Sequence, residues 1–289
     1  MGRDQITGHG INMNFPCVHS EPVGTRPAKA LANILLHSGK RVSCPAANFY
    51  QGWADQGLAV VAHDSQGFGR SKGDDPKHAW IDDFSFGWMT SIKFARQEVL
   101  DPMQPPGTPL PVFMAGHSMG AMLTILTAVR DQGAWQGILL GSPAVDAQLN
   151  WILKFLLMIQ AIAFRVCPNA RIVPAPPFDQ CTGIPELVTR FKTDPLMDQG
   201  PMRVRTGCAF TQAFADISKG GAQLKLPICV IASQTDKIIS VAALHRFLKE
   251  VQSQDVTVHW VENGWHELFL GPHQQEACAA ASQWLQAHV

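Results

Sequence analysis

The chain has 289 residues, enough for one α/β domain that carries an insertion. Its 23 Lys and Arg residues are balanced by 23 Asp and Glu residues, so it lacks the basic field with which proteins attract DNA or RNA. Hydrophobic residues make up 46% of the chain, which indicates a globular protein on the apolar side of the usual range.

The apolar runs alternate along the chain with longer segments of helical pattern. Most of the runs are continuously apolar, which is typical of strands buried on both faces of a parallel sheet. Predicted strands are 32–36, 58–62, 112–115, 138–140, 228–232 and 256–261, and predicted helices are 48–55, 81–98, 119–129, 242–251 and 273–286. This alternation predicts a doubly wound α/β sheet, with the first 30 residues forming an irregular or antiparallel edge.

The alternation stops between residue 141 and about residue 219. This stretch is too long for a loop inside a compact domain, so we predict a helical cap over residues 142–219. The core would then comprise residues 1–141 and 220–289. The segment 151–164 is very apolar but contains Lys154 and is too short to span a membrane. It is interpreted either as a core helix of the cap or as a helix that touches a lipid surface.

The cysteines and the N-terminal residues bear on the compartment. Seven cysteines are scattered singly along the chain and none has metal-ligand spacing, so neither a disulfide framework nor a metal site is expected. Residues 1–30 lack the apolar run of a signal peptide, and Ile6 stands where a myristoylation signal needs Ser or Thr. We expect a cytoplasmic protein.

A G-x-S-x-G pentapeptide, Gly-His-Ser-Met-Gly, occupies residues 116–120. It lies between a predicted buried strand at 110–115 and a good helix-forming segment at 121–128, which is the setting of a nucleophile elbow. The turn must be sharp, and the two outer glycines remove side chains that would collide there. Ser118 is therefore the predicted nucleophile.

A serine hydroxyl needs a base to take its proton, and histidine does this best near neutral pH. In the α/β-hydrolase fold the acid and then the histidine follow the serine in the chain. The histidines downstream of Ser118 are His245, His259, His266, His273 and His288. We choose His266, which sits in a turn after the last predicted strand. His259 falls inside a predicted strand and His245 inside a predicted helix, and His273 and His288 are interpreted as solvent-facing helix residues.

The acid should follow the preceding strand. Asp236 comes just after the predicted strand 228–232, where a buried carboxylate could bind the other imidazole N–H and stabilise the imidazolium. An aspartate at such a place can instead serve as a turn or helix-capping residue, and Asp255 is a weaker candidate for the acid.

Two backbone N–H groups should meet the oxyanion. One belongs to Met119, the residue after the nucleophile. The other is assigned to Gly39, because residues 37–39, His-Ser-Gly, are similar to the usual His-Gly-x-Gly segment apart from Ser38.

Several segments together resemble the monoacylglycerol lipases and their esterase relatives. Residues 63–71, His-Asp-Ser-Gln-Gly-Phe-Gly-Arg-Ser, are similar to the H-D-x-x-G-x-G-x-S segment of that family. The elbow at 116–120 is unchanged, residues 193–196 resemble the family's Ser/Asn-Asp-Pro-Leu, and the acid and base loops also match. The resemblance implies an α/β-hydrolase fold, ester hydrolysis through an acyl-enzyme, and a cap that forms an apolar acyl tunnel and makes peripheral membrane contact.

The departures from this family concern the substrate. Positions where family lipases hold the glycerol head with polar side chains carry Arg41, Pro45, Phe191 and Phe269 here. Without the family's polar side chains at these positions, the hydrogen bonds that specify glycerol are lost, but the ester chemistry is intact. The resemblance places His37, Phe191, Phe269 and Ile159 in contact with the substrate.

Other functions share much of this pattern. A small-ester or aromatic-ester esterase, a lysophospholipase or acyltransferase, and a cofactor-free haloperoxidase would use the same triad. A non-catalytic binding protein of this fold usually loses a triad residue, and all three are kept here. No metal or organic cofactor is expected, because the G-x-G within residues 67–71 follows the wrong strand and lacks the third glycine. The expected partner is a lipid or small-molecule ester.

Overall fold

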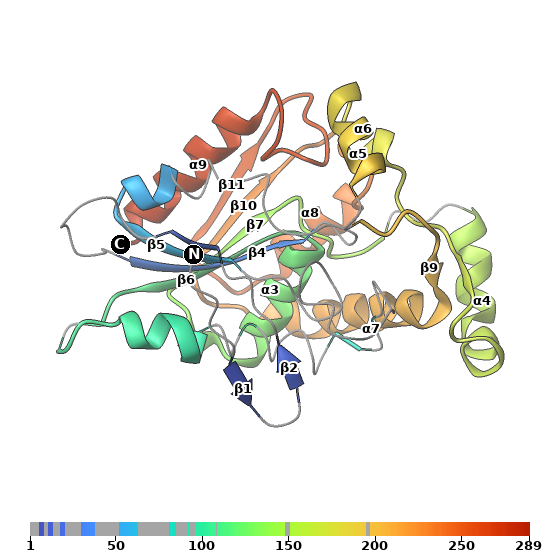
Figure 1. The fold of residues 1–289 in the computed structure, drawn as a ribbon, viewed down its shortest axis with the longest axis horizontal. Coiled ribbons are helices and arrows are strands. Elements are labelled where there is room, and N and C mark those ends of the chain that lie inside the picture. Colours follow the sequence, from blue (N-terminus) through green and yellow to red (C-terminus); the bar gives the residue numbers. More distant parts are fainter. Residues whose placement is uncertain are drawn as a thin grey trace.

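In the part of the chain that the structure describes, seven strands form a mostly parallel central sheet in the order β11-β10-β7-β6-β4-β5-β3 (Figure 1). The computed structural model describes residues 6–8, 11–13, 18–20, 30–37, 52–62, 81, 83–84, 92, 96–107, 109–147, 151–194 and 197–289. The strands of this sheet are β3 (Val18–Ser20), β4 (Ala30–His37), β5 (Leu58–Ala62), β6 (Val112–Ser118), β7 (Gly137–Gly141), β10 (Ile228–Ala232) and β11 (Val256–Trp260). Every pairing is parallel except that of β3 with β5.

Successive residues of the central strands enter two separate hydrophobic clusters. On β6, Val112 and Met114 pack into a cluster with helices α3 (Met119–Arg130) and α8 (Val241–Glu250). Phe113 and Ala115 point to the other face, where α9 (Gln274–Ala287) supplies Ala277, Ala281 and Trp284. Side chains alternate across a strand, so a sheet covered on both faces needs apolar residues at every position. The continuous apolar runs of the sequence have this physical cause.

The N-terminal region forms the antiparallel part of the fold. Strands β1 (Ile6–Gly8) and β2 (Ile11–Met13) form a hairpin, and β3 runs antiparallel to β5 at one edge of the main sheet. The predicted antiparallel edge is therefore confirmed for these strands.

The predicted helix over residues 81–98 is wrong at its start. Ile81 and Asp83 are irregular and Phe84 lies in a turn, while Arg96–Leu100 forms a π-helical turn followed by a 3₁₀ turn at Asp101–Met103. Ile81 and Phe84 are both buried, so their spacing of three residues imitates the apolar face of a helix. The hydroxyl of Thr206 donates to the carbonyl oxygen of Ile81 at 3.4 Å, so this loop is anchored to a distant helix.

Between β7 and β10 the chain forms a largely helical segment. It contains α4 (Trp151–Val166), β8 (Arg171–Val173), α5 (Phe178–Cys181), α6 (Pro185–Thr193), β9 (Met202–Arg203) and α7 (Val204–Gly220). Figure 1 shows α4, α5, α6 and β9 gathered beyond one end of the main sheet. Helix α7 differs from them because Ala209, Ala213 and Ile217 belong to the same cluster as α3. In the described part of the chain, no helix has both the length and the hydropathy needed to cross a membrane.

Candidate active site

Ser118 lies at a strained turn between β6 and α3. Its φ of 55° and ψ of −116° fall in a region that L residues rarely adopt, at a cost of roughly 1–3 kcal/mol. Gly116 and Gly120 approach each other across this turn, and a Cβ at Gly116 would overlap the backbone of Gly120. The turn therefore requires glycine at position 116, and it aims the serine side chain at the end of the sheet.

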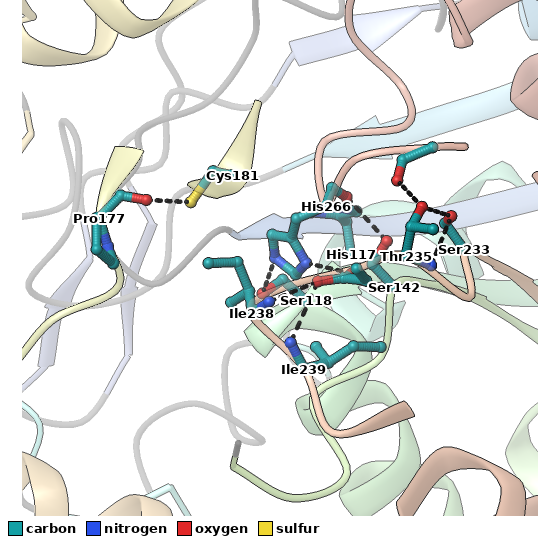
Figure 2. A network of polar contacts seen from close by, with 12 residues as sticks. His117, Ser118, Ser142, Pro177, Cys181, Ser233, Thr235, Ile238, Ile239 and His266 are labelled. Carbon is teal, nitrogen blue, oxygen red and sulfur yellow. Dashed lines mark hydrogen bonds and ion pairs between the residues drawn. The ribbon is translucent and has the colours of Figure 1, made fainter. Parts of the chain in front are cut away.

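His266 contacts both Ser118 and Asp236, and Figure 2 shows His266 beside Ser118. The serine Oγ–H donates to Nε2 of His266 at 2.8 Å, and Nδ1–H of the same ring donates to Oδ2 of Asp236 at 2.8 Å. Asp236 follows β10 and His266 follows β11, so neighbouring parallel strands bring the two together at their carboxyl ends. The structure thus joins the three residues that the sequence nominated.

The acid is fixed by its own hydrogen bonds. The backbone N–H groups of Ile238 and Ile239 donate to Oδ1 of Asp236 at 2.7 and 3.2 Å, which leaves Oδ2 for His266. Burial by itself would raise the pKa of Asp236, but the charge of His266 and these hydrogen bonds outweigh burial and lower it. The carboxylate is therefore ionised at neutral pH.

The interaction between Asp236 and His266 shifts the pKa of His266 in the opposite direction to that of Asp236. Burial would lower the pKa of His266, but the charge and hydrogen bond of Asp236 and the charge of Glu267 together raise it above 6.5. An aspartate that orients an imidazole and stabilises its protonated form allows the imidazole to take a proton from serine and return it to a leaving group.

The competing residues of the sequence analysis have other partners. His245 binds Gln234, His259 binds Glu276, and His288 binds the carboxylate of Asp255 at 2.9 Å. His273 precedes the first residue of α9. Asp255 is therefore engaged away from the site.

Two further residues hold the backbone of His266, and the sequence analysis did not single them out. His117 Nε2–H and the hydroxyl of Ser142 both donate to the carbonyl oxygen of His266, at 3.0 and 2.8 Å. Burial is the main cause that lowers the pKa of His117, so its ring is neutral. Ser142 reaches its position with a φ of 38°, a second strained serine beside the first. The available signal was the place of His117 inside the elbow, immediately before the nucleophile.

Thr235 ties together the loops that carry the acid and the base. Its hydroxyl donates to the carbonyl oxygen of Gly264 at 2.8 Å and also contacts the hydroxyl of Ser233 at 2.9 Å. A Cβ at Gly264 would approach Leu268 and Ser233 to about 3 Å or less, so the two loops pack closely. The Asp236–His266 distance is held by this contact as well as by their own bond.

Of the two candidate oxyanion donors, Met119 lies within the described residues. Met119 is the first residue of α3, where backbone N–H groups have no partner inside the helix. Gly39 lies outside the described residues, as do Arg41, Pro45 and the segment 63–71. His37 ends β4 and pairs in register with Ser118.

A cavity of about 1060 Å³ contains Ser118 and His266 in its wall. Its volume lies at the upper end of typical ligand pockets, roughly 300–1,000 Å³. Phe191 lines it, whereas the lining part of α4 consists of Leu157, Gln160 and Ala163 rather than Ile159. Phe269 is buried with its ring edge-on to His117.

The model of the hydrolase family described as serine aminopeptidase, S33, matches residues 28–273. The chain belongs to this family. Monoacylglycerol lipase of Mycolicibacterium smegmatis is 24% identical over 233 residues, which cover 81% of this chain and 80% of that protein. Human monoglyceride lipase is 28% identical over 211 residues, or 73% of this chain and 67% of the relative.

Solved structures agree on the fold. A soluble variant of monoglyceride lipase from Saccharomyces cerevisiae has a TM-score of 0.83 at 17% identity, covering 100% of this chain and 96% of the other. A carboxyl esterase from Bacillus coagulans has a TM-score of 0.82 at 17% identity, with 100% of both chains covered. The expected α/β-hydrolase fold is confirmed. With the curated relatives, the S33 membership makes the protein a serine hydrolase of the lipase and esterase type.

Substitution of the three residues tests their roles. Ser118→Ala and His266→Ala should each lower kcat by about 10⁴-fold or more, and Asp236→Asn by nearly as much, because the three act as one unit. Ser118→Ala should also abolish labelling by a fluorophosphonate. Ester hydrolysis followed by absorbance is the measurement, with circular dichroism to verify folding. More than a few per cent residual activity in Ser118→Ala would refute the assignment.

The pH dependence tests the electrostatics of His266. The neutral imidazole is the reactive form, and its pKa is raised above 6.5, so the labelling rate should rise with pH through a midpoint above 6.5. Asp236→Asn removes the carboxylate that raises this pKa, so the midpoint should move to lower pH. Fluorophosphonate labelling between pH 5 and 9 measures both. A midpoint that does not move in the variant would contradict this explanation.

Proposed function

We propose that the protein is a carboxylic ester hydrolase similar to monoacylglycerol lipases. Ser118 attacks the ester carbonyl while His266 takes its proton, and His266 then returns the proton to the leaving alcohol. Water releases the acyl group from Ser118 by the same route in reverse. Asp236 stabilises the imidazolium, and the N–H groups of Met119 and Gly39 bind the oxyanion.

The observation that supports this proposal best is the union of the triad with a large, mostly apolar cavity. Ser118 and His266 stand in its wall, and much of the remainder is hydrocarbon from Leu157, Ile172, Val173, Phe210 and Phe214. Such a surface suits an acyl chain, since each buried CH₂ gains about 0.8 kcal/mol. The curated relatives named as monoacylglycerol or monoglyceride lipases support the same substrate class.

We propose that residues 142–219 form the cap of this enzyme. Helix α4 lines the cavity through Leu157, Gln160 and Ala163, and β8, α5 and α7 contribute further lining residues. The segment therefore provides much of the wall that would surround the substrate. Helix α7 is also part of the main hydrophobic core, so it anchors the cap to the sheet.

The outer face of α4 supports peripheral contact with a lipid surface. Phe155, Met158, Ile162 and Val166 are exposed at spacings of three and four residues, so they form one stripe along the helix. Met158 is 83% exposed and Val166 is 77% exposed. A stripe of this kind on the helix that lines the cavity would let an ester pass from a membrane or micelle to Ser118.

Two buried aromatic residues bear on the head group of the ester. Phe191 and Phe269 are buried apolar residues at positions where the resembling lipases hold glycerol with polar groups. Preference for monoacylglycerols over simple alkyl esters should therefore be weaker than is usual in that family.

The free thiols of Cys167, Cys208, Cys229 and Cys278 fit a reducing compartment such as the cytoplasm, and the balanced charge gives no reason to expect nucleic-acid binding.

Acyl-chain length tests the cavity. For the wild type, kcat/KM should rise at least about tenfold from acetyl to octanoyl esters, because each added CH₂ is buried against apolar walls. Leu157→Asp places a charge on the lining face of α4 and should depress octanoyl ester hydrolysis far more than acetyl ester hydrolysis. Gln254→Asp adds the same charge at an exposed site and serves as control. A flat profile would favour the small-ester or aromatic-ester esterase.

Vesicle binding tests the outer face of α4. The wild type should sediment with phosphatidylcholine vesicles, and Met158→Asp or Ile162→Asp should reduce the bound fraction several-fold, because a charge is costly at the apolar boundary. Both variants should retain hydrolysis of a soluble short-chain ester. Gln254→Asp is again the matched control. Undiminished vesicle binding by both α4 variants would exclude this stripe as the contact.

A further inference from the structure

Glu267 directly follows His266 and lines the same cavity as His266 and Ser118. The residue is only 8% exposed. Its backbone N–H donates to the carbonyl oxygen of Cys181 in α5 at 3.0 Å, which holds it between the base loop and the segment above the sheet. A carboxylate is thus placed in the cavity wall beside the reacting atoms.

The carboxylate of Glu267 has neither a hydrogen bond nor an ion pair among the described residues. Two cationic side chains line the same cavity, but both have other contacts. Arg246 pairs with Asp146 at 3.7 Å, and Nζ of Lys237 lies 5.1 Å from the centre of the Trp265 ring. The carboxylate oxygens of Glu267 are not among the side-chain oxygens that are sealed from solvent without a partner, so they remain accessible in the cavity that Glu267 lines. A group of the substrate in this cavity can donate hydrogen bonds to them.

The chemistry of the cavity indicates which part of the substrate carries that group. The walls contributed by α4, β8 and α7 are mostly apolar and suit the acyl chain. His266 must protonate the leaving oxygen, so the alcohol part of the ester has to lie beside His266. Glu267 is the next residue, and α5 and Phe191 are on the same part of the wall. Its carboxylate therefore faces the alcohol rather than the acyl chain.

We propose that the Glu267 carboxylate accepts hydrogen bonds from free hydroxyl groups of the alcohol part and thereby selects esters of polyols over esters of simple alcohols. This inference rests on the proposed ester hydrolysis at Ser118. Hydrogen bonds from hydroxyl groups to a carboxylate are short and strong, and a substrate that displaces water from the carboxylate without donating hydrogen bonds to it is disfavoured. Glu267 would supply polar recognition that Phe191 and Phe269 cannot.

The test compares three esters of one fatty acid: methyl, 2-hydroxyethyl and glyceryl. Wild-type kcat/KM should increase along this series as hydroxyl groups are added. Glu267→Gln keeps the shape but removes the charge, and should lower kcat/KM for the glyceryl ester at least about tenfold and for the methyl ester less than about twofold. Glu262→Gln, on the exposed turn before His266, is the matched control and should change none of the three.

Two conditions keep the comparison clean. Glu267 also raises the pKa of His266, so rates are measured well above the acid limb of the pH profile. The thermal unfolding midpoint and the rate of fluorophosphonate labelling should match the wild type, which shows that the variant is folded with a working nucleophile.

The outcomes separate the inference from the function on which it rests. Equal losses on all three esters, or no loss on any, would overturn the role of Glu267 while leaving ester hydrolysis in place. A wild type that hydrolyses none of the three would instead contradict the proposed function. Cleavage of amino-acid p-nitroanilides that depends on Glu267 would assign the carboxylate to an ammonium group and would also overturn the inference.

Discussion

Ser118 keeps its backbone in a conformation that L residues avoid, and the surrounding core holds it there. Strand β6 is buried along its whole length, and the first ten residues of α3 are buried too. Packing on both sides of the turn therefore prevents the chain from relaxing into an ordinary loop. Everything else at the site takes its position from this turn. The serine oxygen meets His266, the first amide of α3 lies beside it, and the cavity opens above it.

The base is held by hydrogen bonds at both ring nitrogens and at its carbonyl oxygen. Its two ring nitrogens bind Asp236 and Ser118, while its carbonyl oxygen accepts from His117 and Ser142. The ring cannot turn without breaking at least one buried hydrogen bond, and a buried group left unpaired costs about 1–3 kcal/mol. Such preorganisation is what a proton shuttle needs, because no free energy is then spent on orientation during the reaction.

The fold could be predicted largely from periodicity, because strands buried on both faces leave an unmistakable apolar run. Strands β5 and β10 have the bounds that the sequence predicted. The triad was also accessible, since its members follow strand ends in a fixed order. The helix predicted from Ile81 failed because two buried loop residues imitated helical spacing. His117, Ser142 and Glu267 could not be assigned, because their roles depend on one carbonyl oxygen and one cavity wall that exist only after folding.

Helix α7 is part of both the hydrophobic core and the cavity wall. One face, with Ala209 and Ala213, packs into the core around α3, while Gly207, Thr211 and Ala215 line the cavity. The part of the cavity wall that α7 forms is therefore held by core packing, whereas α4 has exposed side chains on its outer face. Shortening the side chains of α7 to enlarge the cavity would leave a void in the hydrophobic core and lower the free energy of unfolding by several kcal/mol. Changing the side chains of α4 would not create such a void. Substitutions that change the acyl-chain length accepted by such an enzyme should therefore be found mainly in α4. Directed evolution of acyl-chain preference would be best aimed at this helix.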